Sequence, residues 1–419
     1  MTKLKLLCIT GIFSSILVHA QDTSFHEKPE FHQLDLKDWL VQKGWIKPRP
    51  QKNHFLLIMP IVATNPTAGF IYGAGLSYAL KADTMSSRVS SASASATYST
   101  NHLLNLNFKS YAFALKDKLV LNGDWRYLVN YEDTYGLGTQ RKENPSGQVD
   151  LNGYPASEDP LSQSLKYDQV RIHETISYAL LKNIYAGLGF QYDYFYNIQD
   201  NTLNTGDSAS ALHYSYSIAH GFNPKKYSIS GLSINFLLDS RDNAVNAYQG
   251  FYANINYRVN LTAFGSTKNS TMLLTEYRSF HPLDGAAQRH ILAFWFYGGF
   301  VVSGELPYLL LPAVGYDLRQ RTGRGYTFGR FRGENMLYQE TEYRFPISPR
   351  TGILGGVLFL NFTSTSDKAN HVDLLDYVRI GWGGGMRIML DKKSRTRLEV
   401  DIGVGEKKTG FYLGAQEAF

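Results

Sequence analysis

Apolar and polar residues alternate with a period of two along most of the chain after residue 54. In the segments 166–180, 226–239 and 248–262, one parity is mostly apolar or aromatic, and the other is polar or small. This period is typical of β-strands whose two faces meet different surroundings, and no stretch of comparable strength has the period of a helix. The pattern predicts sixteen strands, at 54–64, 69–81, 87–99, 102–114, 118–130, 166–180, 184–197, 226–239, 248–262, 269–282, 288–303, 335–347, 351–363, 376–391, 394–406 and 409–419.

The links between these predicted strands fall into two classes. Links that follow even-numbered strands are short, whereas links that follow odd-numbered strands include long ones at 131–165, 198–225 and 304–334. Short turns at one end and long loops at the other are typical of outer-membrane β-barrels, and an even strand number puts both chain ends in the periplasm. Closure of the barrel would leave no unpaired strand edge facing lipid. The sequence therefore predicts an all-β fold, a sixteen-stranded antiparallel transmembrane β-barrel.

The first twenty residues have the order of a cleavable secretory signal. Lys3 and Lys5 precede the apolar run 6–18, and the small residue Ala20 stands at the expected cleavage point. A membrane anchor is the alternative, but the apolar run is shorter than the ~20 residues that a spanning helix needs. The chain is thus expected to divide into a signal peptide at 1–20, a short periplasmic segment at 21–53 and the barrel at 54–419.

The composition agrees with a membrane barrel without proving one. The chain has 43% hydrophobic and 14% aromatic residues and a mean hydropathy of −0.26. In a membrane barrel the hydropathies of lipid-facing and lumen-facing residues cancel, so a mean near zero is expected. A secreted soluble β protein would have similar averages. The one cysteine, Cys8, lies inside the predicted signal, so no disulfide is expected in the mature chain. The periplasmic segment can form one amphipathic helix between Leu34 and Ile46, or it is a disordered leader.

The link 304–334 is unusually basic, and the strands around it carry carboxylates. The predicted strand 335–347 points Glu340 and Glu342 to one side, and this charged side must face the lumen. A basic loop beside lumen carboxylates predicts that the loop folds into the pore and forms charge-assisted hydrogen bonds there. The alternative is that the arginines only fill a polar lumen. The arginines of the loop are Arg319, Arg321, Arg324, Arg330 and Arg332, and further inward charges are expected at Arg344, Arg379, Arg387, Arg397, Glu399 and Asp401.

Several segments in order resemble one family. Arg324-Gly325-Tyr326, followed by GRFRG at 329–333, resembles the Arg-Gly-aromatic motif in the sixth extracellular loop of the BamA/TamA-like outer-membrane superfamily, also called bacterial surface antigens. The segment 237–252, LLDSRDNAVNAYQGFY, resembles the family's turn between strands eight and nine. ETEYRFPI at 340–347 resembles its strand twelve, and GWGGGMR and the ending GFYLGAQEAF resemble its last strands. The match spans nearly the whole predicted barrel.

The resemblance implies that Arg324 locks the loop to inward residues of strands twelve to fourteen. Family members usually have an acidic residue on strand thirteen, where this chain has Asn361, so Glu340 or Glu342 is expected to pair with Arg324. The glycines of GWGGGMR are expected to allow close approach of the loop rather than to bind phosphate, because they lie within a strand. The other residues expected in this lock are Gly325, Tyr326, Arg330, Arg332 and Arg387.

The last strand is expected to reach the chain end. Phe411, Leu413 and Ala415 would face outward, and Phe419 would sit in the periplasmic aromatic girdle as the C-terminal barrel signal. Glu417 breaks this outward parity, at a place near the interface where a charge costs little.

The resemblance implies a protein insertase or translocase in the outer membrane of a Gram-negative bacterium. Its first and last strands would pair weakly and admit client strands by edge pairing. The expected partners are outer-membrane lipid and lipopolysaccharide and client or partner outer-membrane proteins, with no nucleic acid and no cofactor. Residues 21–53 are too short to hold the tandem periplasmic POTRA domains of larger members, which favours a partner-dependent or specialised role.

The sequence leaves two other functions to consider, a pore and a hydrolase. A passive pore or structural barrel is possible because sixteen strands can enclose an aqueous channel, although a loop folded inside would plug it. An outer-membrane hydrolase is disfavoured because no Gly-x-Ser-x-Gly motif or metal-ligand spacing accompanies the histidines. We interpret Asp239 and Asp242 as turn formers rather than an acid/base pair, and we expect no enzymatic activity, catalytic residue or metal site. The residues that a hydrolase could use are His173, His213, His220, His281, His290 and Ser233.

Overall fold

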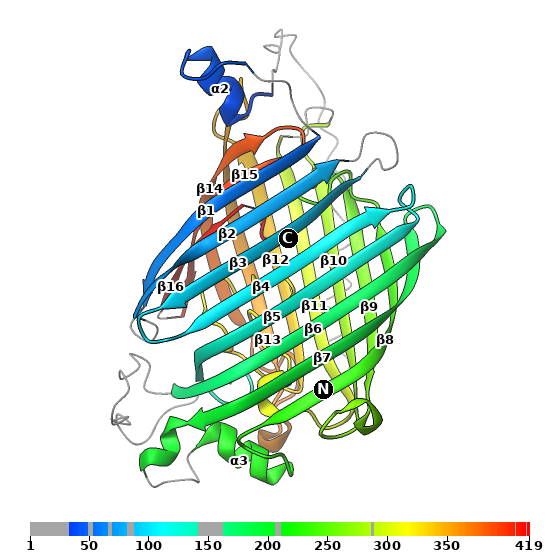
Figure 1. Ribbon diagram of the computed structural model, residues 1–419, viewed down its shortest axis with the longest axis vertical. Coiled ribbons are helices and arrows are strands. Elements are labelled where there is room, and N and C mark those ends of the chain that lie inside the picture. The colour runs from blue at the N-terminus through cyan, green and yellow to red at the C-terminus, as the bar shows by residue number, and fades with distance from the viewer. Residues whose placement is uncertain are drawn as a thin grey trace.

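The computed structural model describes residues 33–48, 53–65, 69–81, 88–140, 162–205, 211–285, 289–406, 408–415 and 417–419, and the predicted signal peptide lies outside them. Sixteen antiparallel strands form one sheet in which each strand is hydrogen-bonded to its neighbours along the chain. The sheet curls round on itself, with the early strands on the near side in Figure 1 and β11 to β14 behind them. We refer to this curled sheet as the barrel.

The strands and helices have the following bounds. The strands are β1 (His54–Asn65), β2 (Gly69–Lys81), β3 (Val89–Ser99), β4 (Leu104–Ala114), β5 (Leu119–Thr134), β6 (Gln163–Leu181), β7 (Ile184–Asp200), β8 (Tyr227–Asp239), β9 (Gly250–Asn260), β10 (Ser270–Pro282), β11 (Ile291–Gly304), β12 (Asn335–Pro346), β13 (Leu354–Thr365), β14 (Arg379–Asp391), β15 (Thr396–Gly405) and β16 (Lys408–Gly414). The helices are α2 (Leu36–Gln42) and α3 (Leu212–Ala219), with short 3-10 helices η1 (Asn201–Thr205), η2 (Thr262–Phe264), η4 (Tyr308–Leu310) and η5 (Lys368–Asn370).

The number, order and antiparallel pairing of the predicted strands are confirmed, but the predicted closure is wrong. Among the described residues, β1 pairs with β2 and β16 pairs with β15, and no ladder joins β1 to β16. β1 has 12 residues, whereas β16 has 7 and ends at Gly414 rather than continuing to residue 419. The sheet stays open at this seam because the described residues after Gly414 turn into the barrel interior, where Ala415 and residues 417–419 are buried.

Side-chain parity gives the barrel an apolar outside and a polar inside. Along β8, Leu232, Ile234 and Phe236 are about half exposed, whereas Ser233 and Asn235 between them are 2% exposed. This is the reverse of a soluble protein and is typical of a barrel whose outer face meets lipid. Among the described residues, no helix has the length and apolarity to cross a membrane.

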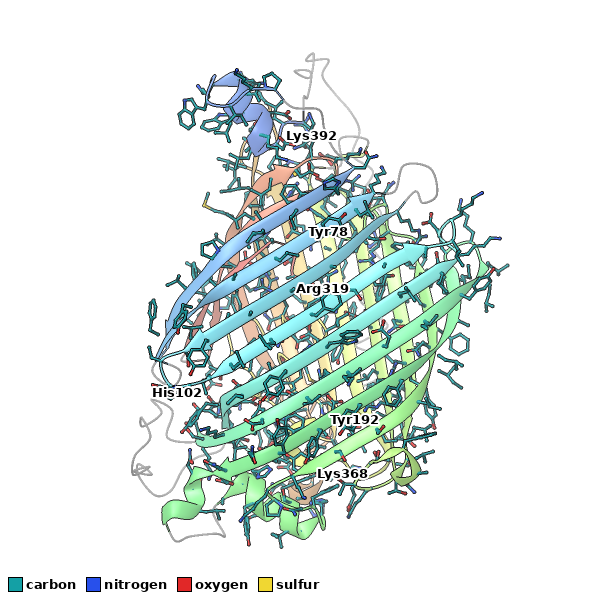
Figure 2. The ribbon with its side chains drawn as sticks, in the orientation of Figure 1. Tyr78, His102, Tyr192, Arg319, Lys368 and Lys392 are labelled. Atoms are coloured by element: carbon teal, nitrogen blue, oxygen red, sulfur yellow. The ribbon has the colours of Figure 1, made fainter. Side chains whose placement is uncertain are left out.

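The two ends of the barrel carry different elements. Figure 2 shows Lys392, in the β14–β15 turn, near one end and Lys368 near the other, where α3 also lies (Figure 1). The predicted helix near residue 40 forms as α2, and the Asp35 side chain caps it by accepting from the Asp38 backbone N–H at 2.9 Å. Lys392 Nζ donates to Asp38 Oδ2 at 2.8 Å, and the Leu34 backbone N–H donates to the Thr351 carbonyl at 2.9 Å. These contacts dock α2 on the turns that follow β12 and β14.

Candidate functional site

The link between β11 and β12 packs against inward-facing side chains of several strands. Tyr308, Leu309, Val314, Arg324 and Arg332 of this link are all at most 1% exposed. Since a loop on the outer surface would expose most of its side chains, this burial reflects contacts with the inner face of the sheet. We call residues 305–334 the inner loop.

Arg324, in the inner loop, has a completely buried side chain. Its guanidinium donates to Glu340 Oε1 at 2.5 Å, to Glu340 Oε2 at 3.1 Å and to Asp401 Oδ2 at 2.8 Å, and it also donates to Glu342. The guanidinium lies 3.6 Å from the centre of the Phe359 ring. The two glutamates are those that the sequence predicts as partners of Arg324. Asp401 comes from β15, and its pairing with Arg324 was missed because inward parity does not reveal depth in the barrel.

The charges around Arg324 balance one another. Burial alone would lower the pKa of Arg324, but Glu340, Glu342 and Asp401 outweigh burial and raise the pKa well above its usual value. A buried ion costs several kcal/mol unless its partners satisfy it, so such a cluster is stable only with its charges matched. The cluster contains the five arginines Arg321, Arg324, Arg344, Arg387 and Arg397 and the five acids Glu340, Glu342, Glu399, Asp401 and Glu417. We call it the ion-pair cluster.

Glycines let the inner loop approach the sheet backbone closely. Gly325 has φ of +101°, and its backbone N–H donates to the Tyr412 hydroxyl at 2.9 Å. A Cβ on Gly325 would lie 2.7 Å from the carbonyl carbon of Val404. On the other side, a Cβ on Gly381 would lie 2.6 Å from the Arg324 carbonyl oxygen, which agrees with the role predicted for the first glycine of GWGGGMR. Tyr326 closes this contact by donating from its hydroxyl to the Ile380 carbonyl at 2.7 Å.

Replacing Gly325 with alanine should destabilise the barrel by more than the cost of a positive φ alone. That cost is about 1–2 kcal/mol, and the added Cβ would also push the loop from the β15 backbone. Gly265→Ala is a matched control, because Gly265 has φ of +98° and nothing within 4 Å of its Cβ position. The free energy of unfolding of both variants is measured in urea, with heat-modified gel mobility reporting the folded fraction. Equal losses of stability would contradict the close contact at Gly325.

The other predicted lock residues have separate partners. Asn361 donates from Nδ2 to the Arg324 carbonyl at 2.9 Å, so it holds the loop backbone rather than replacing an acid. Arg332 reaches the opposite wall, where Nη2 lies 3.1 Å from Glu132 Oε1 on β5. Arg330 lies over the Tyr135 ring at 4.4 Å. The arginines Arg324, Arg330 and Arg332 of the predicted set therefore belong to one loop but contact different walls of the barrel, and Asn361 holds this loop from β13.

The chain end is the second segment that enters the interior. Arg387 Nε donates to Glu417 Oε2 at 2.7 Å, Arg319 Nη1 donates to the Glu417 carbonyl at 3.0 Å, and Arg344 Nη2 donates to a main-chain oxygen of Phe419 at 3.2 Å. The Phe419 ring stacks on the lumen-facing Trp295 with centroids 5.3 Å apart. Burial would raise the pKa of Glu417, but Arg387, Arg344 and nearby Arg397 lower it to about 2.

The predicted place of Phe419 in an outer aromatic girdle is therefore wrong. Its side chain is 2% exposed and belongs to an interior apolar cluster. The physical reason is that Glu417 finds three guanidinium groups inside, whereas an outward position would leave its charge beside lipid. We call the described residues 415 and 417–419 the inward tail.

The residues considered for hydrolysis are dispersed. The hydroxyl of Ser233 accepts from the side-chain amides of Gln191 on β7 and Asn235 on its own strand, and His173 bonds to Asp193 at 2.7 Å. Asp239 pairs with Arg241, and Asp242 accepts from the Tyr248 backbone N–H at 3.0 Å, as turn residues do. No group of three or more potential metal ligands among His, Cys, Asp and Glu occurs in the described residues. His213, His220, His281 and His290 contact the aromatic residues Tyr227, Tyr216, Phe294 and Tyr343 respectively.

Comparison with solved structures identifies barrels of the same fold. The BamA structure from Haemophilus ducreyi that lacks POTRA domains 1–3 is 15% identical, with a TM-score of 0.50, and the match covers 93% of this chain and 74% of that chain. CdiB from Escherichia coli is 10% identical, with a TM-score of 0.52, and the match covers 88% of this chain and 62% of that chain. This chain thus spans about three fifths of the CdiB length. No curated protein matches the sequence.

The family is established by the sequence itself. The Omp85 superfamily domain matches residues 88–419, which is most of the chain and includes the inner loop, the ion-pair cluster and the inward tail. The BamA and CdiB structures agree in fold, and the predicted BamA/TamA-like resemblance is confirmed. This chain belongs to the Omp85 superfamily.

Proposed function

We propose that this protein acts in the insertion, translocation or assembly of outer-membrane proteins, and that it does so from the outer membrane of a Gram-negative bacterium. The observation that carries the proposal is the seam between β1 and β16. β1 offers 12 residues to a neighbour, and among the described residues only β2 is paired with it. Family membership supports the same role.

An unpaired strand edge is costly beside lipid. Each backbone N–H or C=O group without a partner in hydrocarbon costs several kcal/mol, so the free edge of β1 favours any strand that can pair with it. Addition of an extended client segment to this edge would satisfy these groups through main-chain hydrogen bonds, which tolerate many client sequences. The seam is therefore suited to strand exchange.

The inward tail helps to keep the edge of β1 free. Arg319, Arg344 and Arg387 hold Glu417 and Phe419 inside, so the tail cannot extend β16 alongside β1. Because these contacts are formed within the chain, the open seam does not require a bound client.

The occupied interior argues against a passive pore. The inner loop and the inward tail bring paired charges and apolar clusters into the lumen. The half-exposed apolar residues on the outer face, such as Ile234 and Phe236, fit contact with membrane lipid, and lipopolysaccharide would meet the outer leaflet end. The proposed partners are therefore membrane lipids and client outer-membrane proteins, and no enzymatic step is invoked.

Site-specific photocrosslinking tests the proposal. A photoreactive amino acid at Ile58, an outward residue of β1 that is 65% exposed, should crosslink to newly exported outer-membrane proteins in living cells. The same amino acid at Leu188 is the control, because Leu188 is 70% exposed but lies on β7, which is paired on both sides. Equal crosslinking at the two positions, or none at Ile58, would count against client entry at the seam.

A further inference from the structure

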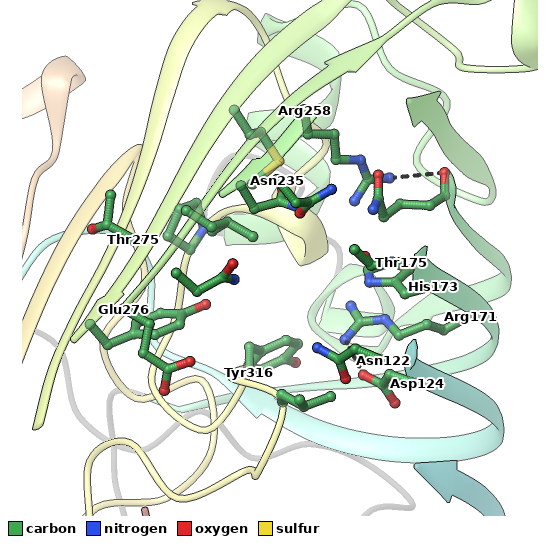
Figure 3. Close-up of a pocket in the computed structure, with 18 of the residues that line it drawn as sticks. Asn122, Asp124, Arg171, His173, Thr175, Asn235, Arg258, Thr275, Glu276 and Tyr316 are labelled. Carbon is green, nitrogen blue, oxygen red and sulfur yellow. Dashed lines mark hydrogen bonds and ion pairs between the residues drawn. The ribbon is translucent and has the colours of Figure 1, made fainter. Parts of the chain in front are cut away.

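The apolar outer face of the barrel carries one carboxylate in an unusual place, on β6. Glu174 lies between His173 and Thr175, and Figure 3 shows these two neighbours pointing into a lumen cavity of about 190 Å³. Because successive residues of a strand face opposite sides of the sheet, the side chain of Glu174 points outward. We propose that the outer face of β4 to β7 binds a partner protein in the same membrane, and that Glu174 receives a lysine or arginine side chain of that partner.

Glu174 lies within the apolar surface and not at its rim. The outward residues on either side of it along β6, Ile172 and Ile176, are 41% and 54% exposed. Its register partner on β7 is Phe190, which is also exposed. Among the outward residues of the strands that the structure describes, Glu174 is the one carboxylate with exposed apolar residues of its own strand on both sides. A charge that faces lipid at such a depth is costly, and charged residues there usually pair with another group and mark a functional contact.

The chain satisfies only part of this carboxylate. Trp125 Nε1 on β5 donates to Glu174 Oε2 at 3.0 Å, and within the described residues no other hydrogen bond or ion pair reaches the Glu174 side chain. An ionised carboxylate can accept about four hydrogen bonds. Since Glu174 is partly exposed on the outer face, its remaining acceptor positions and its negative charge are open to a neighbour in the membrane.

The residues around Glu174 hold the carboxylate at a fixed place on the sheet. Gly123 on β5 is a register partner of Glu174, and a Cβ on Gly123 would lie 2.7 Å from Glu174 Oε2 and 2.8 Å from Ser110 Oγ. The glycine therefore leaves the room that the carboxylate occupies. Phe108 on β4 packs against the Trp125 ring with centroids 5.7 Å apart, which positions the indole donor. We call Ser110, Gly123, Trp125 and Glu174 the outer polar patch.

The occupant of this patch has to bring a positive charge into the apolar part of the membrane. Amino groups of lipids lie in the headgroup layers, outside the hydrocarbon core. A second copy of this chain offers no suitable cation, because no lysine or arginine lies between exposed apolar residues on the outward side of the described strands. A lysine or arginine of a different protein fits, and its charge-assisted hydrogen bond with Glu174 would be stronger in this low-dielectric medium than at an aqueous surface.

The outer polar patch lies on a different wall from the seam. β4 to β7 are hydrogen-bonded to neighbouring strands on both sides, so a partner that covers them would leave the edge of β1 free. The inference rests on the membrane location given in the proposed function, but it does not require client entry at the seam. The partner is therefore expected to be a resident protein of the membrane rather than a newly exported client.

Photocrosslinking in the native outer membrane tests the site. A photoreactive amino acid at Ile172 should crosslink one resident membrane protein, which mass spectrometry then identifies. Leu360 on β13 is the position control, because it is also 41% exposed but lies far from β6 in sequence, and it should not give this product. Glu174→Gln and Glu174→Lys should each reduce the product about tenfold or more, as expected for loss of one partner of a desolvated charge pair. Asp168→Asn should leave the product unchanged, because that outward carboxylate lies nearer the start of β6 and accepts from Asn197 at 2.6 Å.

Exchange of the two charges separates a direct pair from a general effect of Glu174. The crosslinked segment of the partner should contain a lysine or arginine, and its replacement by glutamate should restore the product with Glu174→Lys. Three outcomes would overturn the proposal: no crosslinked protein at Ile172, a product that contains only two copies of this chain, or an equal amount of product with Glu174→Gln. Client entry is measured separately, from newly exported proteins at Ile58, so either result can fail without the other. Heat-modified gel mobility confirms that each variant is folded.

Discussion

Arg324→Ala should destabilise the barrel by at least about 3–5 kcal/mol, the usual cost of removing one partner from a buried ion pair. The loss should lie at or above this range because Glu340, Glu342 and Asp401 would all lose a donor at once. Three buried carboxylates without that guanidinium would repel one another and admit water or protons. The measurement is urea unfolding in lipid vesicles, with trypsin resistance of the inner loop as a second readout.

Two further variants show whether geometry or charge is responsible. Arg324→Lys keeps the charge but loses the paired donors to Glu340 and the planar contact with Phe359, so it should fall between the native chain and Arg324→Ala. Arg330→Ala is the control within the same loop, because Arg330 lies over Tyr135 and its loss should cost about 0.5–2 kcal/mol. If Arg324→Ala costs no more than Arg330→Ala, the lock is not at Arg324.

Sealing the seam with a disulfide should abolish client insertion. Cysteine pairs placed along β1 and β16 would join the two edges covalently, and no client strand could then add to β1. The only native cysteine, Cys8, lies in the predicted signal peptide, so engineered pairs would have no native competitor in the mature chain. The amounts of folded outer-membrane proteins in cells should fall at least tenfold under oxidising conditions and recover when a reductant is added.

The control for this experiment is a disulfide elsewhere on the outer face. Leu188 and Ile234 are register partners on β7 and β8, which are already hydrogen-bonded to each other. A cysteine pair at these positions adds the same crosslink without changing any free edge. Undiminished insertion with the β1–β16 pair fully oxidised would refute strand entry at the seam.

Sequence alternation predicted the strands well because it depends on a local rule. Residues two apart share a face, so apolar outward and polar inward positions repeat wherever the sheet separates lipid from the interior. This rule gave the inward side for Glu340, Glu342 and Asp401, and the structure confirms all three as buried. Family resemblance, rather than alternation, linked Arg324 to this wall.

The same rule failed at the chain end and for contacts across the interior. Alternation in the last ten residues continues as if the strand reached Phe419, and only Glu417 departs from it. That single carboxylate was the available signal, since a charge facing lipid is costly and three arginines inside can pair with it. The pairing of Arg332 with Glu132 was not predictable, because parity gives the face of a strand but not its depth or the path of the loop.

The docking of α2 has a mechanical consequence. Lys392, which holds Asp38, lies in the hairpin turn whose two strands carry Arg387, Glu399 and Asp401. Because the Lys392–Asp38 pair is partly exposed, it is worth at most about 1 kcal/mol and can be released and remade quickly. A displacement of α2 would therefore act on the β14–β15 hairpin beside the seam and, through Leu34 and Thr351, on the β12–β13 turn, and the strands of both turns carry members of the ion-pair cluster.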